Sequence, residues 1–74
     1  MSNECLDLTI NNLGIEEKTL MCLAKHQINY IKELWKLSRK DLKKMNLSDT
    51  EINLIIIKMQ LMGIDLNQKI YNKD

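Results

Sequence analysis

The sequence contains no proline, no phenylalanine and no valine, and only two glycines, Gly14 and Gly63. Strands draw on β-branched and aromatic residues, and tight turns draw on glycine and proline. The chain is poor in all of these, whereas leucine, lysine, glutamate and methionine, which favour helix, are abundant. The composition therefore predicts an all-α fold.

The sequence also lacks the residue sets of most catalytic and metal sites. One histidine, His26, and two distant cysteines, Cys5 and Cys22, do not have the spacing of a zinc site, and the cysteines are expected to be free thiols. No Ser–His–Asp set, paired carboxylates in a cleft or glycine-rich phosphate loop is visible. We predict no enzyme activity, no catalytic residue, no metal, no cofactor and no small-molecule substrate.

No segment approaches the roughly 20 apolar residues that span a membrane, and the N-terminus lacks the basic start and apolar run of a signal peptide. We therefore expect a cytoplasmic protein without a membrane partner. A length of 74 residues with 45% hydrophobic residues fits one small folded domain. We expect a single domain over residues 1–74, with its core in residues 6–66 and a fraying tail in residues 67–74.

The net charge of +1 hides an uneven distribution along the sequence. Residues 1–31 carry a net charge of −2, residues 32–44 carry +4, and residues 45–74 carry −1. The basic middle is a candidate contact for an anionic partner. Such a run is also typical of a solvated helical surface, and the sequence leaves both interpretations open.

Apolar periodicity and capping residues predict four short helices after an N-terminal turn. Thr9 is expected to cap the turn at residues 10–13. Ser48 and Glu51 form a capping box that opens the longest helix, and Gly63 is expected to end it. The predicted helices span residues 16–26, 30–36, 39–45 and 49–62. Their short connections predict a compact bundle.

Helical spacing predicts which side chains of the first two helices face the core. In the first helix, Leu20, Leu23 and Ala24 are expected to point inward. The opposite face carries Lys18 and is expected to face solvent. In the second helix, Trp35 is expected at the core or at its edge.

The last predicted helix is apolar on two sides. An inward stripe is formed by Ile52, Ile55, Ile56, Met59 and Met62. On the opposite side, Leu54, Ile57 and Leu61 fall together. A helix that is apolar on two sides is either buried on both sides or carries a binding face. In one interpretation the tail covers the second stripe, through Ile64, Leu66, Ile70 and Tyr71. In the other, Leu54, Ile57 and Leu61 bind a partner, either a second copy in a homodimer or another protein.

Several short motifs recur at places that match a known family: Leu13-Gly14-Ile15, Cys22-Leu23 with Ile28-Asn29, Glu33-Leu34, and Asn46-Leu47-Ser48 with Gly63. Through these motifs, residues 6–66 resemble the C-terminal domain of the bacterial RNA polymerase alpha subunit. The resemblance implies a four-helix fold of the helix-hairpin-helix or SAM-like kind. It also implies DNA minor-groove binding and contacts with transcription regulators.

The resemblance implies DNA contacts at Lys18, Cys22, Asn46, Ser48 and Thr50. Lys18 stands where the family has an arginine, so the charge is kept and the planar fork is lost. Ser48 stands where the family has a glycine that lets the backbone approach phosphate. Asp49 replaces a basic or small residue and would repel phosphate. Met21 replaces an asparagine, so a polar contact is lost.

Two functions follow from these observations. The first is a transcription-associated DNA-binding module whose binding is weak or non-specific, because specific DNA modules usually present more positive charge. The alternative is a protein–protein interaction module on the same scaffold, which would use the outer face of the last helix or the basic middle. Its partner would then be a protein of the transcription machinery.

Overall fold

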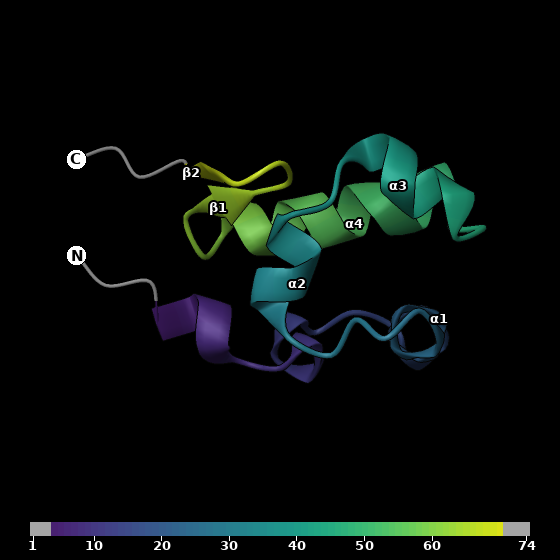
Figure 1. Ribbon diagram of the computed structural model, residues 1–74, viewed down its shortest axis with the longest axis horizontal. Coiled ribbons are helices and arrows are strands. Elements are labelled where there is room, and N and C mark those ends of the chain that lie inside the picture. The colour runs from purple at the N-terminus through teal and green to yellow at the C-terminus, as the bar shows by residue number, and fades with distance from the viewer. Residues whose placement is uncertain (1–3, 71–74) are drawn as a thin grey trace.

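The computed structural model describes residues 4–70, and over this range two short 3₁₀ turns are followed by four α-helices (Figure 1). The 3₁₀ turns are η1 (Glu4–Asp7) and η2 (Ile10–Leu13). The helices are α1 (Glu17–Lys25), α2 (Ile31–Trp35), α3 (Arg39–Lys44) and α4 (Asp49–Gln60). The prediction of an all-α fold with four short helices is confirmed.

The helix starts follow local capping. The hydroxyls of Ser38 and Ser48 accept hydrogen bonds from backbone N–H groups three residues later, and α3 and α4 begin directly after them. α2 begins at Ile31, one residue later than predicted, with Tyr30 as its N-cap. The reason is Glu33, whose carboxylate accepts the N–H groups of Tyr30 and of the residue before it.

Helix ends are set by residues with a left-handed backbone. At the end of α1, Gln27 has a φ of 64°, and the N–H of Ile28 donates to the carbonyl of Leu23 at 2.9 Å. This is the Schellman arrangement, here without glycine. α4 ends at Gln60, two residues earlier than predicted, and a turn leads to Gly63 with a φ of 88°.

The core is a single cluster to which every helix contributes. Its fully buried side chains are Leu23, Ile31, Leu34, Leu42, Ile52, Ile55 and Met59. The prediction that Ala24 points inward is wrong, because Ala24 is exposed. Thr19 is buried instead, since it lies one helical turn before Leu23 and therefore on the same face of α1. Trp35 lies at the core edge, as predicted.

The N-terminal segment is joined to the link between α1 and α2. The N–H of Ile10 donates to the carbonyl of Asn29 at 3.0 Å, and the N–H of Ile31 donates to the carbonyl of Leu8 at 2.9 Å. η2 lies where the turn was predicted. The Thr9 side chain does not cap its backbone, and instead accepts a hydrogen bond from Asn12 Nδ2 at 3.1 Å.

After α4, two short strands form an antiparallel hairpin that the composition did not predict. β1 (Ile64–Asp65) pairs with β2 (Lys69–Ile70). Asn67 and Gln68 make the turn with φ values of 61° and 60°. Glycine is the usual residue at such positions, so its absence concealed the turn in the sequence.

The hairpin lies against the link between α2 and α3. The N–H of Asn67 donates to the carbonyl of Leu37, and the N–H of Gln68 donates to the carbonyl of Trp35, both at 2.8 Å. The Trp35 indole N–H donates to the carbonyl of Lys69 at 3.1 Å. Residues 67–70 of the predicted tail therefore form the turn and second strand of the hairpin.

The described part of the hairpin does not cover the outer stripe of α4. Ile64 and Leu66 are buried in the main core rather than on the outer stripe. Leu54, Ile57 and Leu61 stay exposed, so this part of the tail does not cover them. Tyr71, the side chain of Ile70 and residues 72–74 lie outside the described part of the structure. No helix in residues 4–70 combines the length and apolar character needed to cross a membrane.

Candidate nucleic-acid interface

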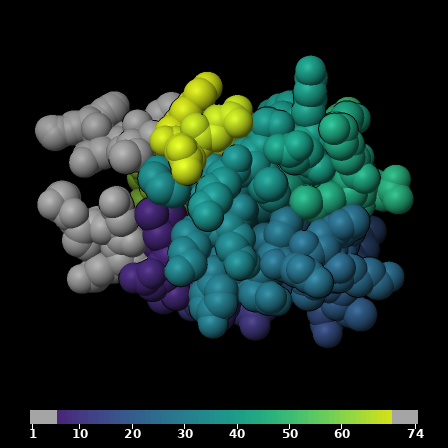
Figure 2. All heavy atoms as spheres, viewed as in Figure 1, coloured from purple at the N-terminus to yellow at the C-terminus, as the bar shows by residue number. Residues whose placement is uncertain are grey.

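Side chains of α1 bind the start of α4 and the residue that follows α3. The buried Thr19 hydroxyl donates a hydrogen bond to Glu51 Oε2 at 3.0 Å, and the Cys22 thiol donates to the carbonyl oxygen of Met45 at 3.2 Å. These bonds hold α1 across the turn between α3 and α4. In Figure 2 the atoms of α1, in blue, lie against the green atoms of this turn at one end of the molecule.

The residues predicted as DNA contacts gather at this end. Lys18 is exposed beside Thr19, and its positive charge adds to the hydrogen bonds from Ser48 and Thr19 that lower the pKa of the Glu51 carboxyl. Cys22 is a half-buried free thiol whose hydrogen bond is used within the domain. The remaining three, Asn46, Ser48 and Thr50, are all exposed.

Asn46 has a backbone role that is independent of DNA. It follows the C-cap of α3 with a φ of 68°, and its N–H donates to the carbonyl of Lys43 at 3.0 Å. Asparagine tolerates the left-handed region better than other non-glycine residues. The geometry of the turn therefore accounts for an asparagine here.

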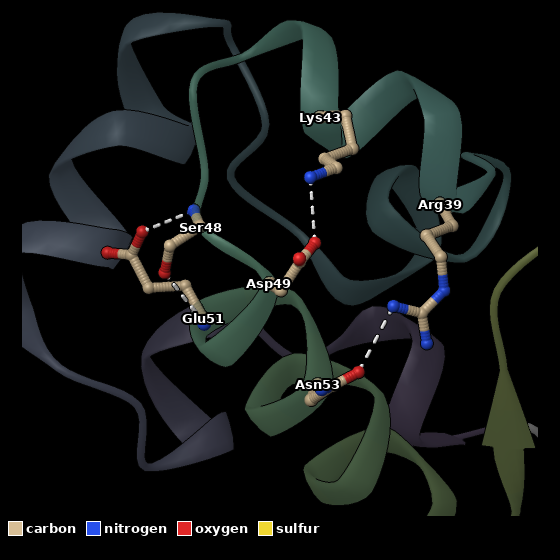
Figure 3. A network of polar contacts seen from close by, with 6 residues as sticks. All are labelled: Arg39, Lys43, Ser48, Asp49, Glu51 and Asn53. Carbon is tan, nitrogen blue, oxygen red and sulfur yellow. Dashed lines mark hydrogen bonds and ion pairs between the residues drawn. The ribbon is translucent and has the colours of Figure 1, made fainter.

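Side chains at the start of α4 form hydrogen bonds with the backbone there. Ser48 Oγ accepts the N–H of Glu51 at 3.1 Å, and Glu51 Oε1 accepts the N–H of Ser48 at 2.8 Å (Figure 3). The backbone hydrogen bond from Ser48, followed by the hydroxyl of Thr19, lowers the pKa of the Glu51 carboxyl. The backbone N–H groups at a helix N-terminus can bind external anions. Here the Glu51 carboxylate of the same helix accepts one of these N–H groups itself.

Two cations of α3 are also directed toward α4. Lys43 Nζ lies 2.7 Å from Asp49 Oδ1, and Arg39 Nη1 donates to Asn53 Oδ1 at 3.1 Å (Figure 3). The hydrogen bond and charge of Lys43 lower the pKa of the Asp49 carboxyl. The exposed Lys43–Asp49 pair adds little stability, but it offsets one positive charge beside the turn. A phosphate approaching the turn between α3 and α4 would therefore meet two carboxylates in the first turn of α4, those of Asp49 and Glu51.

The residues predicted to bind a partner lie on the outer face of α4, directed away from the core. The exposed fraction is 40% for Leu54, 49% for Ile57 and 78% for Leu61. Large aliphatic side chains at this spacing form one apolar strip along the helix. The strip begins one helical turn after Thr50, so this candidate surface adjoins the polar surface at the turn.

The carboxylates near the turn act as helix caps and surface charges. They are engaged in the capping bonds of Ser48 and in the contact with Lys43. Within residues 4–70, no three His, Cys, Asp or Glu side chains are grouped so that they could hold a metal ion. The polar chemistry available to a ligand at this end is therefore that of Lys18 and its exposed neighbours.

Sequence reasoning missed the bond between Thr19 and Glu51. Glu51 was recognised only as a partner of Ser48, three residues away. Thr19 lies 32 residues from Glu51 in the sequence, so no local pattern connects them. The available signal was the position of Thr19 one turn before Leu23, which places a hydroxyl on the buried face of α1.

Comparison with known proteins identifies the family of this domain. The family model of the C-terminal domain of the bacterial RNA polymerase alpha chain matches residues 1–61, so the match ends before the C-terminal hairpin. Among curated proteins, no individual sequence matches this one significantly. With four helices in the expected order and a family match over most of its length, the protein belongs to the family of the C-terminal domain of the bacterial RNA polymerase alpha subunit.

Proposed function

We propose that this domain binds DNA weakly, with little dependence on base sequence, through α1 and the turn between α3 and α4. Membership of the alpha C-terminal domain family makes it a transcription-related, non-catalytic domain. The observation that supports the proposal is the bond between Thr19 and Glu51 at 3.0 Å, which holds α1, the helix that carries Lys18, against the start of α4. An exposed lysine on a helix is a suitable contact for a phosphate.

The charges at the turn support weak binding. Each phosphate neutralised by a lysine or arginine contributes affinity through counterion release. Lys18 is the only one of the five candidate contacts that carries positive charge, while Asp49 and Glu51 stand in the first turn of α4. We expect a dissociation constant in the range typical of non-specific binding, roughly 1–100 µM, at physiological salt.

Fluorescence anisotropy of a labelled AT-rich duplex, measured at several salt concentrations, tests this proposal. Lys18→Ala should weaken binding at low salt and reduce the slope of log affinity against log salt by about one. Asp49→Lys should strengthen binding roughly three- to tenfold, because it replaces a repelling charge with an attracting one. Circular dichroism of each variant checks that the helices are retained.

A matched control separates the turn from general charge effects. Asp7→Lys makes the same change of charge at η1, which lies at the opposite end of the molecule from α1 and the turn (Figure 1). This variant should bind with nearly the wild-type affinity. The proposal fails if the wild type gives no anisotropy change at low salt, or if Asp7→Lys and Asp49→Lys strengthen binding equally.

The exposed strip on α4 favours a second function for the same scaffold, namely contact with a protein. Leu54, Ile57 and Leu61 expose large apolar surfaces that a monomer would rarely leave in water together. None of these three residues is among the candidate DNA contacts, although Leu54 lies one helical turn after Thr50. The function does not require DNA binding, and it predicts that Lys18→Ala leaves protein association unchanged.

A further inference from the structure

Two cations of α3 reach the helix that follows it. Lys43 Nζ lies 2.7 Å from Asp49 Oδ1 at the start of α4. One helical turn farther along α4, Asn53 Oδ1 accepts a hydrogen bond from Arg39 at 3.1 Å (Figure 3). The partner of Arg39 is a neutral amide, so only the contact nearest the turn between α3 and α4 joins opposite charges.

The contact between Lys43 and Asp49 is of the kind that a lysine makes with a phosphate. In both cases an ammonium donates a charge-assisted hydrogen bond to an anionic oxygen. Asp49 stands between Ser48 and Thr50, two of the proposed DNA contacts, and Lys43 lies in the last turn of α3. Lys43 therefore lies beside the proposed DNA surface, with its ammonium directed to a carboxylate of the same domain.

We propose that Lys43 is a further phosphate contact of the DNA-binding surface, and that the Asp49 carboxylate competes with phosphate for it. This inference rests on the proposed function, because it concerns the same surface. Each protein cation that meets a phosphate adds affinity by releasing counterions. A lysine that must first leave a carboxylate adds less. Asp49 thus lowers the affinity in two ways, by its own charge and by its hold on Lys43.

The pair is exposed enough to be exchanged for a phosphate. The exposed fraction of the side chain is 54% for Lys43 and 71% for Asp49. Exposed ion pairs are weak, because water and salt screen them. The hydrogen bond and charge of Lys43 lower the pKa of the Asp49 carboxyl, so Asp49 keeps its negative charge at neutral pH. A negative charge at residue 49 is therefore present whenever DNA approaches.

Lys44 provides a matched comparison on the same helix turn. It is exposed and lies directly after Lys43. Its charge acts on Asp41 of α3, where it adds to the hydrogen bonds from Ser38 that lower the pKa of that carboxyl. Replacing Lys44 changes the charge of α3 by the same amount as replacing Lys43, but it leaves the pair with Asp49 in place.

The ion pair can be tested without DNA by a carbon-13 NMR titration of the Asp49 carboxyl. Lys43→Ala should raise the pKa of Asp49 toward the ordinary aspartate value, because a hydrogen bond and a nearby charge are lost. Lys44→Ala should change this pKa less. An Asp49 pKa that is the same in the wild type and in Lys43→Ala would overturn the proposal.

The competition is tested by fluorescence anisotropy of a labelled AT-rich duplex at several salt concentrations. The slope of log affinity against log salt counts the cations that meet phosphates, at about 0.9 for each. Asp49→Asn keeps the size of the side chain and removes its charge. It should strengthen binding roughly two- to fivefold and steepen the slope by about one, because Lys43 is released.

Lys43→Ala should then act differently in the two backgrounds. In Asp49→Asn it should flatten the slope by about one, because a phosphate contact is lost. In the wild type it should lower the affinity, since the Asp49 carboxylate is left unpaired, and keep the slope. Lys44→Ala is the control, and its effect on the slope should be equal in both backgrounds. Circular dichroism should show retained helices in every variant.

The outcomes separate this inference from the proposed function. If the wild type binds DNA and Lys43→Ala changes the slope equally in both backgrounds, the competition between Asp49 and phosphate is overturned and weak DNA binding stands. If the wild type does not bind at low salt but Asp49→Asn does, the proposed function fails and the role of Asp49 is supported. If neither protein binds, both are overturned.

Discussion

The two faces of α4 are built from the same kinds of residue and have opposite surroundings. Ile52, Ile55 and Met59 on the inner face are fully buried, whereas Ile57 on the outer face is 49% exposed. Secondary structure and hydrophobicity are alike on the two sides. The difference teaches that apolar character makes a residue available for burial, and that the neighbouring elements decide which residues are buried.

Several elements bury the inner side of α4. The elements α3, η2 and β1 contact the helix, and side chains from each of them are buried with it in one cluster. β1 brings Ile64 into that cluster, while the rest of the hairpin follows the link between α2 and α3. No element in residues 4–70 buries Leu54, Ile57 or Leu61, which stay exposed on the outer face.

The largest expected effect is a difference in the free energy of unfolding between substitutions of one isoleucine on each face. Ile55→Ala should lower the free energy of unfolding by about 2–4 kcal/mol, because it leaves a cavity in a close-packed core. Ile57→Ala should change it by less than about 0.5 kcal/mol. Urea denaturation measures both values.

This comparison of the faces would break if the two variants lost equal stability. Such a result would mean that the outer face is covered within the monomer. The control is Leu54→Ala, a second outer position, which should behave like Ile57→Ala.

A smaller effect is expected at the start of α4, which both faces share. Ser48→Ala should lower the free energy of unfolding by about 1 kcal/mol, because it removes the hydroxyl that accepts the N–H of Glu51. Thr50→Ala, two residues later on the exposed face, should have little effect. Thermal or urea unfolding of the two variants gives the comparison, and an equal loss in both would contradict the capping role of Ser48.

The smallest expected effect is the response of this helix start to acid. The pKa of the Glu51 carboxyl is lowered in the fold, mainly by the backbone hydrogen bond from Ser48. A carboxyl of this kind binds protons more weakly in the folded than in the unfolded state. It therefore stabilises the fold at neutral pH, and this contribution is lost as the pH falls below about 4.

Unfolding by urea at several pH values between about 7 and 3 measures this loss. Glu51→Gln removes the titrating group and should make the pH dependence shallower than that of the wild type. Asp41 in α3 also has a lowered pKa, through hydrogen bonds from Ser38, so part of the acid response should remain in the variant. An unchanged profile in Glu51→Gln would show that Glu51 does not contribute.

Much of the fold could be predicted from local sequence. The capping pairs Ser38–Asp41 and Ser48–Glu51 each act over three residues, so their positions fixed the starts of α3 and α4 to the residue. Helix ends were less accurate, because Gln27 adopts a left-handed backbone that its side chain does not favour. Local chemistry is therefore a better guide to where helices begin than to where they end.

The candidate site divides in the same way. The resemblance supplied Lys18, Ser48 and the other proposed contacts, and the charge of Asp49 could be read directly from the sequence. The bond between Thr19 and Glu51 could not be predicted from the sequence, because it joins residues that meet only after α1 packs on α4. The proposed weakness of DNA binding follows from the sequence, while the contact between α1 and the start of α4 follows from the fold.

The sequence by itself determined four short helices, the starts of α3 and α4, and two apolar stripes on the last helix. These features depend on residues a few positions apart, which interact in any polypeptide that becomes helical. Only the tertiary structure decided which stripe is buried. That choice depends on the path of the hairpin, which Asn67 and Gln68 turn toward the Trp35 side of the molecule through hydrogen bonds between segments distant in sequence.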